Sequence, residues 1–138
     1  SICNVIKCRP PNNRVPLDDE ALLCLVYLYQ QISIVQPDII IGLGSTAMHC
    51  ILYNAKKKFT IDGYISGMTV TSNRNKIHNI TLPKLYKVDP WSGDVIITYH
   101  PSGMLRNKKL LALGKEDFKF IKRYLCSCME KKNIEHSR

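Results

Sequence analysis

The stretch VIITYHPSGMLR, residues 95–106, is the segment from which both the fold and a candidate site are predicted. Val95–Thr98 is apolar and β-branched, follows a turn-forming Ser92-Gly93-Asp94, and stops at His100-Pro101. A short run of this kind, bounded by turn residues, predicts a buried strand that ends abruptly. The sequence therefore places a histidine at the carboxyl end of a strand.

The segment after this strand is expected to form a constrained loop. Pro101 disfavours helical backbone at His100, and the following Ser-Gly pair favours a sharp bend, which puts an exposed apolar pair, Met104 and Leu105, beside the imidazole. Ligand crevices in open α/β sheets lie outside the carboxyl ends of the strands. His100 is therefore a candidate for chemistry, with a structural or surface histidine as the alternative.

Composition indicates one globular domain over residues 1–138, because 45% of the residues are hydrophobic and 22% are charged. No apolar run approaches the ~20 residues of a membrane span. Neither a signal peptide nor a transit peptide is visible, so we expect an intracellular protein without a specified compartment. Because the chain opens on Ser1 and enters structured-looking sequence at once, we expect the domain to lack its N-terminal portion.

The charge balance favours a polyanionic partner. Twenty Lys and Arg against eleven Asp and Glu give a net charge of +9, which favours nucleic acid without choosing between DNA and RNA. Solubility is the other explanation of such a charge. The six cysteines are expected to be reduced thiols or metal ligands, and the pair Cys126 and Cys128 to be ordinary thiols.

Strands are expected to alternate with helices along the chain. The predicted elements are a strand at residues 1–7, a helix from Pro16 to about Gln36, a strand at Asp38–Ile41, a short helix with Ser45 as its N-cap running to about Ala55, the strand before His100, and a helix at Lys108–Tyr124. Residues 72–78 are expected to be a polar, basic loop. The alternation predicts an α/β fold, a three-layer α/β/α sandwich with a mainly parallel central sheet.

Three further residues or motifs have both a functional and a structural interpretation. The amide of Asn4 offers the donor and acceptor that a base edge needs, or it bonds neighbouring backbone. The glycine-rich GLGST at residues 42–46 offers N–H groups to a phosphate, but it lacks the third glycine and the lysine of nucleotide-binding loops, and tight strand-to-helix packing also explains its glycines. His49 is expected to be a packed histidine and not a ligand.

Four sequence blocks follow one another along most of the chain. They are NVIKCRPPNNRVP at Asn4–Pro16, EALLC at Glu20–Cys24, PDIIIGLGSTA at Pro37–Ala47 and TYHPSGMLRN at Thr98–Asn107. In this order they resemble the uracil-DNA glycosylase superfamily, most closely its iron–sulfur-containing families four and five. The segment from about residue 64 to 93 does not align. The resemblance implies base-excision repair, in which the N-glycosidic bond of a flipped-out uracil is hydrolysed.

The resemblance also implies roles for single residues. Asn4 matches the residue that hydrogen-bonds the uracil edge. His100 matches the histidine of the HPS motif, a donor that stabilises the departing base. The residues expected to contact DNA are Lys7, Arg9 and Ser102, together with Met104, Leu105 and Arg106 in the loop that enters the duplex.

Two cysteines match ligands of a 4Fe–4S cluster in the resembled families. Cys8 and Cys24 lie sixteen residues apart, which fits the spacing in those families. The other two ligands come there from an N-terminal Cys-x-x-Cys, which this sequence does not contain. The resemblance thus implies a cluster for which two of four ligands are present.

The family's first block, which supplies an acidic or water-positioning residue before the Asn strand, has no counterpart in Ser1–Cys3. Two hypotheses remain for that reason. The first is a glycosylase acting on uracil-containing DNA, favoured by Asn4 and the complete HPS motif. The second is a catalytically inactive glycosylase-like subunit among RNA and protein neighbours in a larger assembly such as an organellar ribosome, favoured by the missing block and the +9 charge. A nucleotide-binding module built on GLGST is a third, weaker hypothesis.

Overall fold

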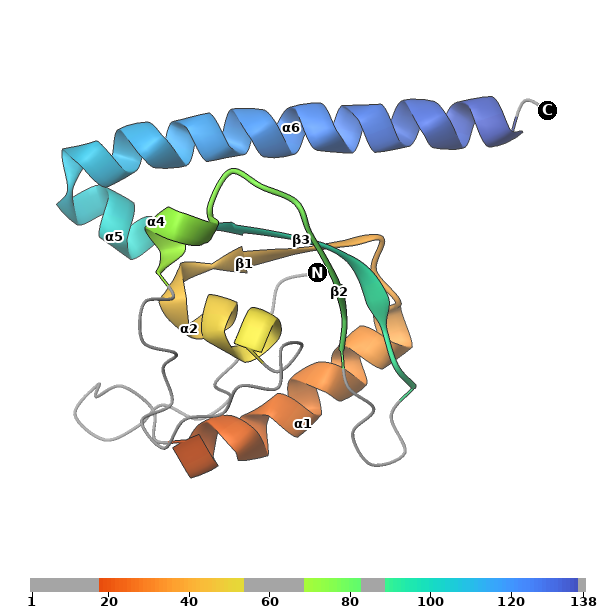
Figure 1. The fold of residues 1–138 in the computed structure, drawn as a ribbon, viewed down its shortest axis with the longest axis horizontal. Helices are drawn as coiled ribbons and strands as arrows, with labels where there is room; N and C mark the ends of the chain where they lie inside the picture. Colours follow the sequence, from red (N-terminus) through yellow and green to blue (C-terminus); the bar gives the residue numbers. More distant parts are fainter. Residues whose placement is uncertain (1–17, 54–68, 83–88, 137–138) are drawn as a thin grey trace.

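The computed structural model describes residues 18–53, 69–82 and 89–136, and the predicted strand at residues 1–7 lies outside them (Figure 1). The described elements are α1 (Asp18–Val35), β1 (Ile39–Leu43), α2 (Gly44–Met48), a π-helical turn (His49–Tyr53), α4 (Val70–Asn73), β2 (His78–Thr81), β3 (Ser92–Thr98), α5 (Pro101–Arg106) and α6 (Lys108–His136). No helix in these ranges is long and apolar enough to cross a membrane.

The strand that precedes His100 is the central strand of the described sheet. The order is β1-β3-β2, with β1 parallel to β3 from Ile39 opposite Asp94 to Leu43 opposite Thr98. β2 pairs with the other edge of β3 in antiparallel register. Figure 1 shows α6 on one side of this sheet and α1 with α2 on the other. The α/β prediction is confirmed, and the sheet is a parallel pair extended by one antiparallel strand.

Two predictions from the sequence are wrong in the region of the antiparallel strand β2. Residues 72–78 are predicted to form a loop, but α4, held by a capping box between Thr69 and Ser72, extends to Asn73, and β2 begins at His78. Ser92 and Asp94 are not in a turn but in β3, because they face β2. There the Thr81 and Ser92 hydroxyl oxygens lie 2.8 Å apart, and the Asn79 amide donates to Asp94 at 2.9 Å.

Side chains of β3 point alternately to the two faces of the sheet and are buried on both. Val95, Ile97 and Tyr99 belong to the cluster that α1, α2 and the π-helical turn complete with Leu28, Tyr29, Ile32, Met48 and Leu52. Because successive side chains of a strand point to opposite faces, Ile96 and Thr98 point to the side of α6, where Ile121 is also buried. Both faces of the central strand are therefore covered.

The glycines of the β1–α2 connection have structural reasons, but the closest contacts are to the neighbouring strand and to His100, and not between strand and helix as predicted. A Cβ at Gly42 would lie 2.7 Å from Cδ1 of Ile97 on the neighbouring strand. Gly44 has φ +90°, a conformation that favours glycine. Because α2 begins at Gly44, its N-cap is Leu43, and the predicted cap at Ser45 is wrong.

The remaining helices agree with the sequence pattern apart from their ends. α1 ends at Val35, one residue before the predicted end. α6 continues to His136, beyond the predicted end at Tyr124. His49 is 6% exposed, and its burial lowers the pKa of the imidazole below its usual value, so the prediction of a packed histidine is confirmed.

Candidate functional site

His100 is held in one orientation by the residue two positions further on. The segment after it is not a loop but the short helix α5, with His100 as its N-cap and Pro101 at its first position. The backbone N–H of Ser102 donates to Nδ1 of His100 at 3.1 Å, and the Ser102 hydroxyl lies 2.8 Å from the same nitrogen. Because Nδ1 accepts, a neutral imidazole carries its hydrogen on Nε2.

The imidazole lies where two parallel strands end. β1 is followed by Gly44 and β3 by Tyr99 and His100, and a Cβ at Gly44 would lie 3.1 Å from Cβ of His100. The glycine therefore lets the two strand ends approach each other. Since His100 is exposed, its Nε2–H donor is available to a ligand at the carboxyl edge of the sheet.

α5 exposes one apolar side chain, where the sequence predicts two. Leu105 is 84% exposed, but Met104 is only 7% exposed, so the prediction of an exposed Met104 is wrong. Met104 packs onto α6 at Gly114, where a Cβ would collide with its sulfur. Helical backbone turns consecutive side chains in different directions, so Met104 anchors the helix while Leu105 and Arg106 face solvent.

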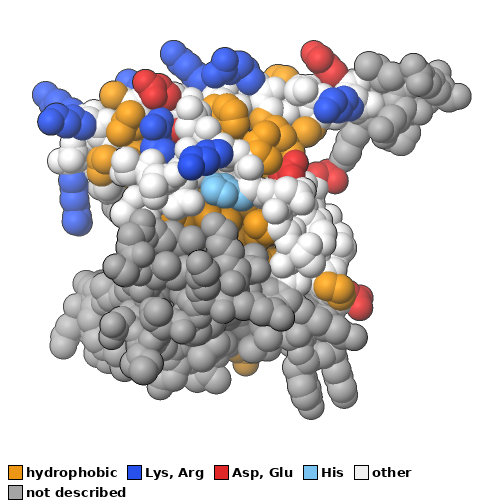
Figure 2. Space-filling model, viewed as in Figure 1, with side chains coloured by type: hydrophobic (Ala, Val, Ile, Leu, Met, Phe, Trp, Pro, Cys, Tyr) orange, Lys and Arg blue, Asp and Glu red, His pale blue; other side chains and the backbone are white. Residues whose placement is uncertain are grey.

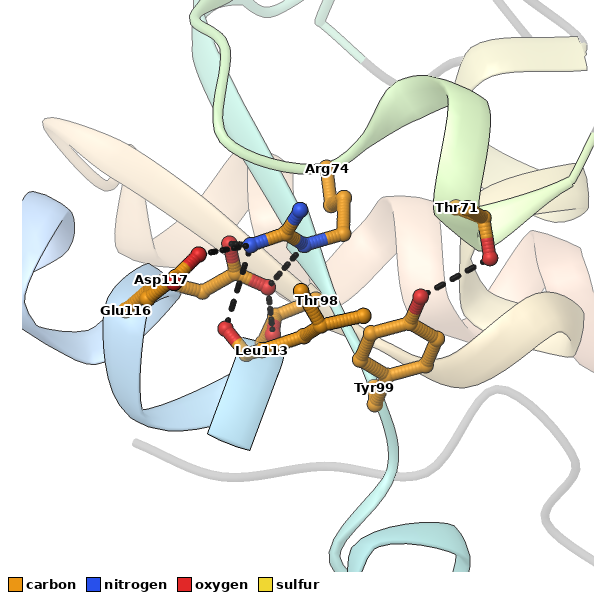
Figure 3. Close-up of polar contacts among 7 residues, drawn as sticks. All are labelled: Thr71, Arg74, Thr98, Tyr99, Leu113, Glu116 and Asp117. Atoms are coloured by element: carbon orange, nitrogen blue, oxygen red, sulfur yellow. Dashed lines mark hydrogen bonds and ion pairs between the residues drawn. The ribbon is translucent and has the colours of Figure 1, made fainter. Parts of the chain in front are cut away.

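A buried carboxylate on α6 anchors the end of β3 (Figure 3). Asp117 is fully buried, and its Oδ2 accepts a hydrogen bond of 2.6 Å from the Thr98 hydroxyl. Arg74 compensates the charge, with Nε 3.1 Å from Oδ2 and a terminal nitrogen 2.9 Å from Oδ1. The hydrogen bond to Asp117 is the largest cause that raises the pKa of Arg74 above its usual value.

Arg74 makes further contacts to the same helix. It donates to the carbonyl oxygen of Leu113 and to the carboxylate of Glu116, each at 3.2 Å. Its backbone forms a bridge with Ile97 of β3. Arg74 therefore links the end of α4, the strand before His100 and α6.

Neither Arg74 nor Asp117 is among the predicted site residues. A signal for Asp117 was nonetheless present, because it falls four residues after Leu113 and four before Ile121, on the buried face of α6. An acid on an apolar face requires a partner. The partner was not predictable, since Arg74 lies in the segment of residues 64–93 that the sequence blocks leave unmatched.

A second polar cluster lies at the opposite end of β3. Asp94 accepts hydrogen bonds from the Tyr124 hydroxyl and from the Asn79 amide. The bond from Tyr124, more than that from Asn79, lowers the pKa of Asp94 below its usual value. Burial and the bond to Asp94 raise the pKa of Tyr124. This cluster fastens α6 to the sheet far along the strand from His100.

Basic side chains gather on the outer side of α6, where Figure 2 shows Lys and Arg atoms along the helix. Lys115, Lys119 and Lys122 are exposed and share one helix face by their spacing. An exposed basic face of this kind suits the polyanionic partner that the net charge favours.

The remaining predicted site residues fall largely outside the described ranges. Asn4, Lys7, Cys8 and Arg9 lie outside them, so their roles stay predictions. Cys24 lies in α1. Among the residues that the structure describes, three or more His, Cys, Asp or Glu side chains nowhere gather as metal ligands would.

Comparisons with known proteins identify a family profile and relatives that match most of this chain. The family profile described as the Uracil DNA glycosylase superfamily matches residues 1–126. A protein of Thermotoga maritima named Type-4 uracil-DNA glycosylase is 38% identical over 128 residues, which cover 90% of this chain and 55% of the relative. Proteins of the same name from Saccharolobus solfataricus and Sulfurisphaera tokodaii are 34% and 36% identical, covering 91% and 88% of this chain.

The matches account for most of this chain but not for most of each relative. The chain spans about half the length of these relatives, with 55%, 52% and 49% of their residues aligned. The matched region includes the GLGST connection, the HPS segment and most of α6, through residue 126. The chain belongs to the uracil DNA glycosylase superfamily.

Proposed function

We propose that the protein is a uracil-DNA glycosylase, which hydrolyses the N-glycosidic bond of a flipped-out uracil in base-excision repair. The observation that carries this proposal is the imidazole of His100, whose Nδ1 accepts from Ser102 and whose Nε2–H therefore points away as a donor. Cleavage of the bond between C1′ and the base leaves the electron pair on uracil. The oxygen of water then bonds to C1′ of the sugar, and the proton that this water loses neutralises the uracil anion. A fixed donor at the developing oxyanion stabilises this charge.

The other roles follow from the resemblance and from exposure. We assign Asn4 to the uracil edge, where its amide supplies a donor and an acceptor. Leu105 is the apolar side chain available to fill the vacated stack, while Met104 supports it from the buried side. Lys7, Arg9, Ser102 and Arg106 are assigned to the DNA backbone.

Uracil release from a labelled oligonucleotide tests the proposed function. The longest native form of the protein should release free uracil from single- or double-stranded DNA and nothing from a thymine oligonucleotide of the same sequence. If a well-folded native form releases uracil from neither substrate, the assignment fails. The catalytically inactive subunit then becomes the hypothesis to test, by identifying the RNA or protein that co-purifies.

The exposed apolar side chain of α5 gives a prediction about DNA form. Leu105→Ala should slow uracil release from double-stranded DNA about tenfold, because an apolar wedge offsets the cost of unstacking the base. Release from single-stranded DNA, which requires no such opening, should change by less than about twofold. Initial rates on the two substrates at equal protein concentration measure the ratio.

Leu111→Ala is the matched control, since Leu111 is a partly exposed leucine of α6 and lies outside α5. It should leave both rates unchanged. An equal loss on both DNA forms for Leu105→Ala would contradict the wedge role.

We further propose that Cys8 and Cys24 provide two thiolate ligands of a 4Fe–4S cluster. The described residues supply Cys24 on α1 but hold no group of three candidate ligands, so a complete site needs residues outside the described ranges. When bound, such a cluster would tie its ligand-bearing segments together. Support comes from the sixteen-residue spacing of the two cysteines.

Iron content tests the cluster separately from activity. Cys24→Ser in the longest native form should lose most of the bound iron and the visible absorption of the cluster, because removing one thiolate opens the site. Cys126→Ser, which changes an exposed cysteine of α6, should retain both. Iron bound equally by the Cys24→Ser variant and the unaltered protein would show that Cys24 is not a ligand.

A further inference from the structure

The two residues immediately before His100 are held from opposite faces of the sheet. On the α6 side, the Thr98 hydroxyl donates to Asp117 at 2.6 Å. On the other side, the hydroxyl oxygens of Tyr99 and Thr71 lie 2.8 Å apart, which joins the strand end to α4 (Figure 3). The backbone that enters His100 therefore has little freedom to shift.

The acceptor of the Thr98 hydrogen bond is the carboxylate of Asp117, and burying a carboxylate costs free energy. Both Thr98 and Asp117 are fully buried, and Oδ1 of Asp117 lies 2.9 Å from a terminal nitrogen of the Arg74 guanidinium. An apolar pair would cover this end of the sheet without the desolvation cost of the two charges. A buried ion pair fixes geometry in a way that an apolar contact does not, because hydrogen bonds have preferred lengths and directions.

The helix that carries Asp117 also supports α5, the helix that follows His100. Asp117 is on α6, and Met104 of α5 packs against Gly114, one turn earlier on the same helix. Thus α6 holds the strand before His100 through Asp117 and the helix after it through Gly114. The ring itself is then oriented by Ser102.

We propose that the hydrogen bond from Thr98 to Asp117 is a positioning contact for His100, which sets where the Nε2–H donor lies relative to the departing base. Neither residue touches the base, so both act through His100. This inference rests on the proposed function for its effect on the rate, but its effect on the imidazole is independent of that function.

Two substitutions separate the contact from the bulk of the side chain. Thr98→Val removes the hydroxyl and keeps the shape, whereas Thr98→Ser keeps the donor and loses a methyl group. Thr81→Val is the matched control, because it removes a hydroxyl contact, the one between Thr81 and Ser92, at the other end of the β2–β3 pair. Each is made in the longest native form of the protein, alone and combined with His100→Ala.

Single-turnover uracil release is the first measurement. Thr98→Val should slow it about tenfold to a hundredfold, because small misplacements of a catalytic group have effects of this order. DNA binding should be unchanged, Thr98→Ser should recover most of the rate, and Thr81→Val should leave it unaltered. Combined with His100→Ala, Thr98→Val should cause less than about a twofold further loss, since its effect passes through the imidazole.

The second measurement is the nitrogen-15 spectrum of the histidine rings, with His100 assigned by comparison with His100→Ala. The His100 ring of the unaltered protein should show an acceptor Nδ1 and a protonated Nε2 near neutral pH. Thr98→Val should move these resonances toward a mixture of tautomers, and Thr98→Ser and Thr81→Val should not.

The outcomes distinguish a failure of this inference from a failure of the proposed function. Equal losses from Thr98→Val with and without His100 would overturn the positioning role and make the contact merely structural. If the unaltered protein releases no uracil, the proposed function fails, and the ring resonances alone decide the inference. Resonances unmoved by Thr98→Val would then overturn it, and moved resonances would support it.

Discussion

His100→Ala is expected to slow uracil release about a hundredfold to a thousandfold, the cost of removing one preorganised donor from a developing oxyanion. The Nε2–H of this residue is aimed by two contacts from Ser102 to Nδ1, at 3.1 and 2.8 Å, so it is fixed before the base departs. Stability should fall only by the cost of losing a helix N-cap, about 0.5–2 kcal/mol, because the side chain is otherwise exposed. Single-turnover rates, with DNA binding measured in parallel, give the loss.

A second histidine variant controls for loss of an imidazole as such. His78 lies in β2, with Nε2 2.8 Å from the carbonyl oxygen of Asn73. His78→Ala should keep the rate within about twofold, since its ring stabilises a turn and no charge on the base. If His100→Ala retained a rate within about threefold of the unaltered protein, His100 would not be the stabilising donor.

Asp117→Ala is expected to destabilise the fold by about 3–5 kcal/mol, because removing one partner of a buried pair leaves the other charge uncompensated. Arg74 would keep its contacts to Leu113 and Glu116 but lose the carboxylate that approaches it at 2.9 Å. The Thr98 hydroxyl would lose its acceptor as well. Urea unfolding followed by circular dichroism measures the change through the midpoint and slope.

Glu116→Ala provides a matched comparison, since Glu116 is the neighbouring carboxylate on the same arginine. Its side chain is 65% exposed, whereas that of Asp117 is 0% exposed. An ion pair in that position contributes about 0–1 kcal/mol. Equal destabilisation by the two substitutions would show that burial of Asp117 does not decide the stability of the cluster.

The sequence predicted the elements whose pattern is local. A continuous apolar run indicated β1, an apolar periodicity indicated α1 and α6, and the β-branched run before His100 indicated β3. The expectation that His100 lies at a strand's carboxyl end is confirmed. These predictions succeeded because each depends on residues close together in the chain.

Contacts between distant segments were not predictable in the same way. Arg74 and Asp117 are 43 residues apart, and neither belongs to a motif that pairs them. The antiparallel pairing of β2 with residues 92–95 depends on which strand edge is free, and Ser-Gly-Asp by itself is typical of a turn. The burial of Met104 depends on the space that Gly114 leaves across the α5–α6 contact.

The segments before and after His100 are expected to differ in local stability, because β3 is the central strand of the described sheet and α5 is a short helix. Both edges of this strand are hydrogen-bonded and Val95–Thr98 is fully buried, so we expect its amide hydrogens to exchange with water only when the whole domain unfolds. α5 is a six-residue helix, too short to be stable by itself, so we expect its amide hydrogens to exchange through small local openings. A local opening of α5 would leave the buried strand that leads to His100 intact.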